Sequence, residues 1–364
     1  MKIRIPFLDL ADMHADLADE LKAKFNKMLQ KGIFSGGEEV DLLESSLKDF
    51  LKVPHAIACA NGTDAMELAL RVLEIGPGDE VIVPALTWVS TAEVVKMVGA
   101  EPVFCDVDQY GLLDLNVLEQ QITEKTKAVM PVHLYGKMVD MKRLIQITQP
   151  LGIKVVEDAA QAFGAFQEGN SAGVFGEMGC FSFYPTKNMG ALGEAGLVIT
   201  SDDALANKIR LMLTHGQSKR DVHELVGRNS RIDSLQAGFL NVKMEYFLAW
   251  QQKRKQLAGI YLEHLQHLKG ITVPDGILKD DHNAHIFAIR SEERDALKQY
   301  LEKQGIGTAI HYPKAVSATK PFEGDGDFPM ANKIAQTTLS LPLHPYLGEK
   351  EVRQVCEAVQ AFFN

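Results

Sequence analysis

The sequence predicts an α/β fold, with helices covering both faces of a mostly parallel sheet of about seven strands. Between residues 50 and 215, short apolar runs alternate with amphipathic stretches. Runs such as HAIACA, VIVPA and IKVV are flanked by turn residues, as expected of strands that are buried on both faces. The stretches that follow the first two, AMELALRVLEI and TAEVVKMVG, have the helical periodicity of crossover helices.

The later elements continue this alternation in order. We expect PVFCDV to be a strand, LNVLEQQI a helix, KAVMPVHL a strand, MKRLIQITQPLG a helix and IKVVEDAA a strand. CFSFY and GLVIT then complete the set of strands, and the amphipathic LANKIRLMLTHG follows them as a helix.

A smaller α+β domain is expected after this sheet. A long helical region from Ile232 to about Leu268 leads to the strand-like HIFAIR. EERDALKQYLEKQG is expected to be a helix, IGTAIHY a strand and KEVRQVCEAVQAFF the closing helix. We therefore expect a large domain over residues 1–240 and a small domain over residues 241–364.

The composition gives no general attraction to nucleic acid or to an anionic membrane. The 364 residues carry 38 Lys and Arg against 48 Asp and Glu, a net charge of −10. The four cysteines form no spacing typical of a zinc or iron–sulfur site, so no metal is expected. Because the start MKIRIPFLDLAD is unlike a signal peptide and no apolar run of about 18 residues occurs, we expect a cytoplasmic protein with reduced thiols.

Polar residues at the ends of the predicted strands mark the candidate site, because ligands of open α/β sheets bind there. NGTDA follows HAIACA and precedes a helix, so Gly62 and Thr63 could offer backbone N–H groups and a hydroxyl to a phosphate. The alternative is a plain helix cap made by Thr63 or Asp64. Trp88 follows VIVPA, where its indole could stack on a flat ring or simply pack in the core.

An acidic pair follows the next strand. Alternation places Glu157 and Asp158 on opposite sides of IKVV, so only one of them faces a given pocket. A carboxylate buried there requires a cationic partner, such as a protonated ring nitrogen. A structural aspartate with satisfied hydrogen bonds is the alternative.

The stretch FYPTKNMGALGEAG, from Phe183 to Gly196, contains one lysine after a strand. Lys187 precedes the glycines, so this is not the G-x-x-x-x-G-K-[ST] nucleotide loop. Ser182 points away from the phenylalanines on either side of it. An isolated lysine is usually solvated. Together, however, a phosphate seat, a flat aromatic, an acid and a lysine describe a pyridoxal phosphate site, where Lys187 supplies the amine that forms a Schiff base with the cofactor's aldehyde.

The segments NGTDA, VEDAAQAFGA, FSFYPTKNMGALGEAG and GRNSRIDSLQAGFL, in this order, resemble the DegT–StrS group of nucleotide-sugar aminotransferases. The resemblance extends from FLDL to SLPLHPYL. It implies fold type I of the pyridoxal phosphate enzymes, with active sites shared across a homodimer. It also implies an amino-acid donor, most often L-glutamate, and a nucleotide-linked keto-sugar as acceptor.

The resemblance assigns a role to individual residues. Lys187 would carry the cofactor and shuttle the proton, while Asp158 would pair with the ring nitrogen. The remaining cofactor residues that it implies are Gln161 near the ring hydroxyl, Trp88 on the ring face, Gly62, Thr63 and Ser182 at the phosphate, and Asn229 from the neighbouring subunit. The positions that it implies for the sugar nucleotide are Arg231, His311, Tyr312 and the loop FSGGEEV, residues 34–40.

Two departures from the group's pattern concern the substrate and the lysine loop. Ala195-Gly196 stands where two glycines are common, and Lys314-Ala315-Val316 follows Tyr312-Pro313 where Pro-Leu-His is frequent. The segment THGQSKRDVHELVGRNSRID looks most like members that aminate C3 of a UDP-2-acetamido-3-keto-uronic acid. A dTDP-3-keto-6-deoxyhexose is the close alternative.

Three other functions are weighed against amination. Sugar 3-dehydratases of this fold carry histidine in place of the lysine, and some add an iron–sulfur cluster, unlike this sequence. A regulatory protein on the same fold would need a decayed cofactor site, and no basic patch supports DNA binding. A pyridoxal phosphate lyase acting on amino acids would need an arginine for the α-carboxylate, for which Arg290 and Arg353 stay open.

Overall fold

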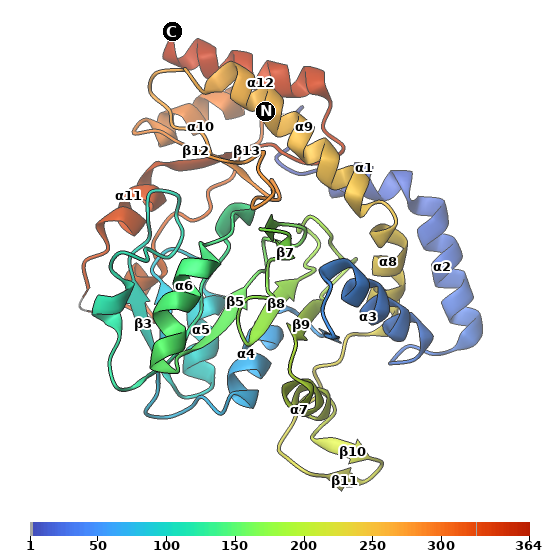
Figure 1. Ribbon diagram of the computed structural model, residues 1–364. Coiled ribbons are helices and arrows are strands. Elements are labelled where there is room, and N and C mark those ends of the chain that lie inside the picture. The colour runs from blue at the N-terminus through green and yellow to red at the C-terminus, as the bar shows by residue number, and fades with distance from the viewer. Residues whose placement is uncertain (1–2, 325) are drawn as a thin grey trace.

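A seven-stranded sheet forms the centre of the computed structural model, which describes residues 3–324 and 326–364 (Figure 1). Its strand order is β1-β9-β8-β5-β4-β2-β3. The strands are β1 (His55–Cys59), β2 (Glu80–Pro84), β3 (Glu101–Cys105), β4 (Thr126–Val129), β5 (Lys154–Asp158), β8 (Met178–Ser182) and β9 (Gly196–Thr200). Pairing is parallel from β8 to β3, and β9 runs antiparallel to β1 and β8. The mostly parallel sheet is confirmed.

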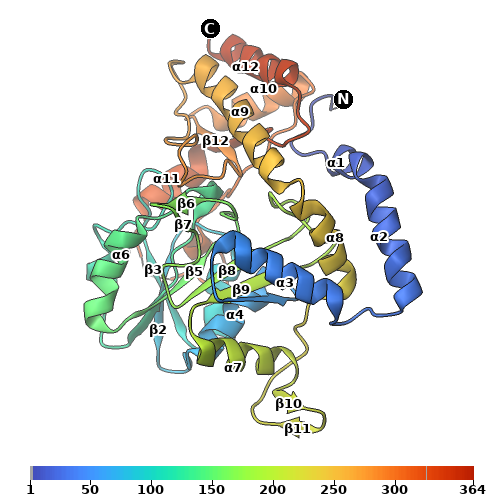
Figure 2. The ribbon, with the colours of Figure 1, turned by 45° about the vertical axis from the view of Figure 1, so that its right-hand side comes forward.

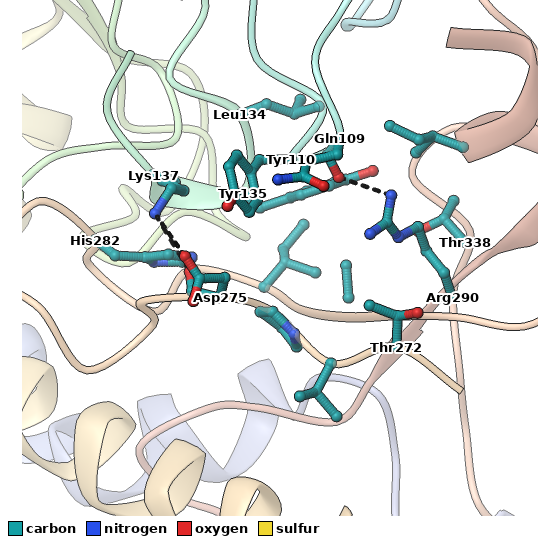
Figure 3. A pocket seen from close by; sticks show the side chains of 15 residues that line it. Gln109, Tyr110, Leu134, Tyr135, Lys137, Thr272, Asp275, His282, Arg290 and Thr338 are labelled. Carbon is teal, nitrogen blue, oxygen red and sulfur yellow. Dashed lines mark hydrogen bonds and ion pairs between the residues drawn. The ribbon is translucent and has the colours of Figure 1, made fainter. Parts of the chain in front are cut away.

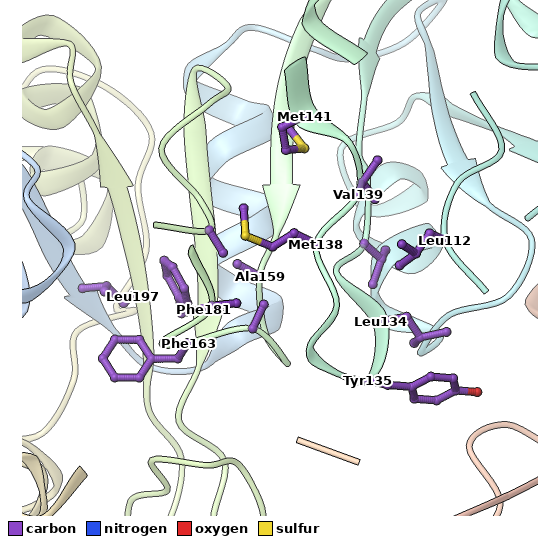
Figure 4. Packing of buried hydrophobic residues seen from close by; sticks show 14 of the residues in the cluster. Leu112, Leu134, Tyr135, Met138, Val139, Met141, Ala159, Phe163, Phe181 and Leu197 are labelled. Carbon is purple, nitrogen blue, oxygen red and sulfur yellow. The ribbon is translucent and has the colours of Figure 1, made fainter. Parts of the chain in front are cut away.

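Helices cover both faces of this sheet and bury its alternating side chains in two apolar cores (Figure 2). One core includes α3 (Glu38–Leu51), α6 (Met141–Thr148) and α8 (Ser234–Met244). The other includes α4 (Gly62–Val72), α5 (Ser90–Met97) and α7 (Asp203–Leu213). Figure 4 shows part of the first core, where Phe181 and Leu197 of the strands meet Phe163. Three layers result, as the buried apolar strands require.

A smaller lobe lies beyond the end of the sheet (Figure 1). It pairs β12 (Phe287–Arg290) with β13 (Thr338–Leu341) and adds α9 (Phe247–Leu265), α10 (Arg294–Lys303) and α12 (Glu349–Phe363). The expected division at residue 240 stays a proposal. Ile5 packs in the small core, whereas α11 (Pro329–Thr337) contributes to the large one.

The other elements are shorter or peripheral. α1 (Leu10–Asp16) and α2 (Ala18–Lys31) pack against α8 and α9. The remaining strands are the short pairs β6 (Phe166–Gln167) with β7 (Asn170–Ser171), and β10 (Gln217–Lys219) with β11 (Val222–His223). No helix in residues 3–324 and 326–364 is long and apolar enough to span a membrane.

Two of the predicted elements, the helix LNVLEQQI and the strand IGTAIHY, are wrong. LNVLEQQI forms only a short 3₁₀ turn at Leu118–Gln121, because its first backbone groups bond instead to Asp114 and Arg143. IGTAIHY is not a strand. It makes single bridges, from Ile306 to Ile5 and from Ala309 to Ser340, before the chain turns toward the site. β13 occupies the place beside β12.

Candidate active site

The start of α4 forms a seat of free backbone N–H groups. Asn61 follows β1, and its side chain accepts the N–H of Asp64 at 2.8 Å. The helix cap is therefore Asn61, and not Thr63 or Asp64 as in the alternative above. The N–H groups of Gly62 and Thr63 have no partner within the described part of the chain. Such groups at a helix N-terminus attract a phosphate.

Close packing holds this seat against the ends of β8 and β9. A Cβ added to Gly62 would lie 2.8 Å from Ser182 Cβ, so only glycine fits beside the serine. A Cβ on Gly196 would lie 2.3 Å from the Asn61 carbonyl carbon. Ser182 is thereby brought to the start of α4, on the side of β8 away from Phe181 and Phe183, as its alternation predicts.

Asp158 lies at the end of β5 and is 5% exposed. Its Oδ2 accepts the Thr91 hydroxyl at 2.8 Å, and its Oδ1 accepts the Ala160 N–H at 3.1 Å. Burial raises the pKa of Asp158, and these two hydrogen bonds and the nearby Lys187 charge partly offset that effect. A cationic group placed against this carboxylate would keep it ionised.

Glu157 points to the other side of β5 and has a structural role. It is fully buried, and its oxygens accept His133 Nε2 at 2.9 Å. They also accept the backbone N–H groups of Gly173, Phe175 and Gly176. The hydrogen bonds of Glu157 are therefore satisfied within the protein, and Asp158 is the carboxylate left for a ligand.

Lys187 lies in a tight loop after β8. Its N–H donates to Tyr184 O at 2.8 Å, and the N–H of Ala191 returns to Phe183 O at 2.8 Å. A Cβ on Gly190 would lie 2.4 Å from Pro185 O, so a glycine is needed for the loop to close. Burial lowers the pKa of Lys187 to about 8, although Asp158 acts in the opposite direction. The amine is therefore much easier to deprotonate than a solvated lysine.

Two supports of this loop were not found from the sequence. Lys243 of α8 is fully buried and donates to Gly190 O at 2.6 Å, with His14 Nε2 2.9 Å away. Asn188 Oδ1 lies 2.8 Å from His285 Nδ1. A lysine in a helix and a histidine near a strand are ordinary surface or core residues by pattern, so no sequence signal distinguishes them.

The other side of the site joins the large domain to the small lobe. Gln161 Nε2 donates to the Tyr312 hydroxyl at 3.1 Å, and the Trp88 and Tyr312 rings are 5.6 Å apart. His311 Nδ1 lies 2.9 Å from Ser340 Oγ. Burial, with a contribution from the Lys187 charge, lowers the pKa of His311 to about 4, so this imidazole is neutral at physiological pH. Trp88 is 57% exposed, leaving an indole face open.

Asn229 and Arg231 are not joined to the other candidates. Both residues are exposed. Within the described residues, neither side chain makes a hydrogen bond or ion pair with another candidate residue. Their backbone runs along the end of β1, where Cys59 bridges to Arg231. The loop at residues 34–40 packs on the same segment, since the Ser234 N–H donates to Phe34 O at 3.1 Å. These residues form an open rim near the phosphate seat.

The donor set fits pyridoxal phosphate. It offers the free N–H groups of Gly62 and Thr63 beside the Ser182 hydroxyl at a helix start, an open indole, a buried carboxylate and a lysine of lowered pKa. Within the described residues, no cluster of histidine, cysteine or acidic side chains could hold a metal ion. The fold and site thus define a pyridoxal phosphate-dependent transferase of the α/β type.

The chain belongs to the DegT/DnrJ/EryC1/StrS aminotransferase family, whose profile matches residues 15–360. Members of this family use pyridoxal 5′-phosphate. The chain is 41% identical to the UDP-N-acetyl-3-dehydro-α-D-glucosamine 3-aminotransferase of Acidithiobacillus ferrooxidans, over 98% of this chain and 97% of the relative. It is 38% identical to the dTDP-3-amino-3,4,6-trideoxy-α-D-glucose transaminase of Streptomyces venezuelae, over 98% and 96%.

Solved structures agree with this membership. The crystal structure of S. venezuelae DesV in complex with a ketimine intermediate superposes with a TM-score of 0.96 at 37% identity. The match covers 100% of this chain and 99% of DesV. Fold type I, expected from the resemblance, is confirmed.

Proposed function

We propose that the protein transfers the amino group of L-glutamate to the C3 keto group of a nucleotide-linked sugar, with pyridoxal phosphate as cofactor. The observation that carries this proposal is that Lys187, whose pKa burial lowers, and the buried Asp158 lie close enough for each charge to act on the pKa of the other, with the free start of α4 at the end of the same sheet. Bound there, the cofactor supplies an aldehyde that carries the amino group and a pyridinium that accepts electrons.

Each cofactor residue has a role that its environment supports. The N–H groups of Gly62 and Thr63 and the hydroxyl of Ser182 would hold the phosphate. Asp158, oriented by Thr91, would hold the ring nitrogen in its charged form. Gln161 would contact the ring hydroxyl and Trp88 would lie on the ring face.

Lys187 would carry the cofactor and, once displaced by the donor, move a proton between carbon atoms. A pKa of about 8 leaves an appreciable neutral fraction near physiological pH, as a general base requires. The loop contacts from Tyr184 and Lys243 hold this amine in place through both halves of the reaction.

The sugar nucleotide would enter over the open rim and contact Arg231, His311, Tyr312 and the loop at residues 34–40. Relatives named for UDP-linked 2-acetamido-3-keto sugars or their uronic acids favour a substrate of that class. Relatives named for dTDP-3-amino sugars make a dTDP-3-keto-6-deoxyhexose the second candidate. Both classes share amination at C3.

Two copies of the chain would complete each site. Trp88, Asn229 and Arg231 are all exposed, although the proposed reaction requires an enclosed pocket. Asn229 of one copy would reach the phosphate seat of the other. The four cysteines are buried and unpaired, which supports a cytoplasmic setting.

The test uses purified enzyme, pyridoxal phosphate and nitrogen-15-labelled L-glutamate with each candidate keto-sugar. Mass spectrometry should show the nitrogen-15 label in the sugar nucleotide only, and unlabelled 2-oxoglutarate should form in an amount equal to that of the aminated sugar. An enzyme that consumes glutamate but labels neither sugar class would refute the proposed acceptor. A product dehydrated at C3, with no label, would indicate the dehydratase chemistry instead.

A further inference from the structure

A cavity of about 240 Å³ lies between the large domain and the small lobe (Figure 3). Its walls come from the loop after β3, the turn at residues 134–137, the segment at residues 272–275 and strands β12 and β13. None of the cofactor or sugar residues proposed above lines it. The proposed reaction therefore leaves this cavity without a role.

The cavity contains a cation without an acidic partner. Arg290 Nη1 donates to the Gln109 carbonyl at 2.7 Å, and within the described residues no carboxylate pairs with this guanidinium. Lys137 lies 3.9 Å from an Asp275 carboxylate oxygen and 5.1 Å from the centre of the Tyr110 ring. One acid and two cations give the lining a net positive charge, with Nε and Nη2 of Arg290 left to bind an anion.

A buried hydroxyl points to the same conclusion. Thr338 is fully buried at the start of β13 and lines the cavity. Its Oγ1 makes no hydrogen bond of normal geometry in the described part of the chain, and its polar neighbour is the Tyr135 hydroxyl, on whose pKa it acts. Buried polar groups are normally satisfied, so an unpaired one at a cavity wall indicates a missing partner. Leu134, Ile286 and Ile334 supply apolar walls. A compact carboxylate with an apolar body matches this combination.

Tyr135 belongs both to this cavity and to the wall of the active site. Its ring lines the cavity, its N–H donates to Gln161 Oε1 at 2.7 Å, and its hydroxyl donates to the His311 carbonyl. Its backbone has a φ of 60°, a left-handed conformation that a tyrosine rarely adopts. Strained residues of this kind concentrate at functional positions. A ligand that shifts Tyr135 would be felt by Gln161 and His311.

We propose that this interdomain cavity binds a small organic carboxylate that acts as an effector, separate from both substrates. The carboxylate pairs with the free edge of Arg290 and accepts the Thr338 hydroxyl, while its body lies against the apolar wall. The bound ligand contacts both the turn at residues 134–137 and Arg290 of β12. It thereby shifts Tyr135, whose hydrogen bonds reach Gln161 and His311 in the active site.

The test measures binding of benzoate to the cofactor-loaded enzyme by calorimetry, with phenyl phosphate and benzyl alcohol as comparisons. Benzoate should bind once per chain and benzyl alcohol should not bind. Arg290→Gln should weaken benzoate by at least about tenfold, since a charged hydrogen bond is lost. Thr338→Val should weaken it by a smaller factor, and Arg353→Gln, a surface control, should leave it unchanged.

The second arm asks whether the site is separate and coupled. Benzoate binding should persist under saturating L-glutamate, and benzoate should change the KM for the keto-sugar in the wild type but not in Arg290→Gln. Where the enzyme lacks that activity, the shift is read instead in the visible spectrum of bound cofactor. Competition with L-glutamate would make Arg290 the donor's carboxylate site and overturn the proposal. Absent binding, tighter binding of phenyl phosphate, or binding with no change at the active site would also overturn it.

Discussion

Removing the Thr91 hydroxyl should shift the pH dependence of the enzyme. Thr91 donates to the buried Asp158 at 2.8 Å, and this bond opposes the rise in the pKa of Asp158 that burial causes. A hydrogen bond to a charged group contributes about 1.5–3 kcal/mol. Since one pKa unit corresponds to about 1.4 kcal/mol, Thr91→Val should raise the pKa of Asp158 by about 1–2 units.

The direction in which the pH profile shifts depends on which protonation state of Asp158 supports activity. Protonated Asp158 cannot stabilise a ring cation, so activity is lost as the pH falls through the pKa of this group. The acid limb of the kcat profile should therefore move to higher pH by about 1–2 units in Thr91→Val. Thr91→Ser should keep the wild-type profile. Thr87→Val should shift it less, because within the described residues the Thr87 hydroxyl hydrogen-bonds to Thr91 and not to Asp158. An acid limb of Thr91→Val that coincides with the wild type would refute this role of Asp158.

Three further predictions test the seat, the loop and the shared site. Gly62→Ala should weaken cofactor binding and destabilise the fold by about 1–3 kcal/mol, because its Cβ would overlap a serine; Gly259→Ala, with nothing within 4 Å, should stabilise it in the same urea titration. Burial lowers the pKa of Lys243 to about 8, so as the pH rises the folded state releases this proton at a lower pH than the unfolded state does. Between pH 8 and 10.5 the free energy of unfolding of the wild type should therefore rise by about 3 kcal/mol relative to that of Lys243→Met. If the free energies of unfolding of the two proteins change in parallel with pH, this prediction is wrong. Mixing Asn229→Ala with Lys187→Ala should restore about a quarter of wild-type activity through mixed dimers, and no recovery would exclude a shared site.

The runs that form strands, and the places where those strands end, were predictable because buried parallel strands have a distinct apolar pattern. The order of the strands within the sheet was not predicted. The alternation of Glu157 and Asp158 correctly separated the two acids, but the pattern did not say which one faces the pocket. That choice depends on His133 and three backbone N–H groups, which come from other parts of the chain. Tertiary hydrogen bonds of this kind leave no local signal.

The errors have the same origin. IGTAIHY has the composition of a strand, yet the place beside β12 is taken by β13, and only Ala309 pairs with it. Lys243 is typical of an exposed helix position, although packing of α8 buries it beneath the lysine loop. Pairing partners and helix orientation are set by the whole fold and so are not contained in a short pattern.

A visible spectrum of the purified protein, before and after L-glutamate, tests the central claim most directly. The wild type with pyridoxal phosphate should be yellow, and L-glutamate should bleach the colour as the amino group is taken up. Lys187→Ala should lack both the colour of lysine-bound cofactor and the bleaching. A wild-type protein that stays colourless with added pyridoxal phosphate, or a Lys187→Ala protein that behaves like the wild type, would contradict the role of Lys187.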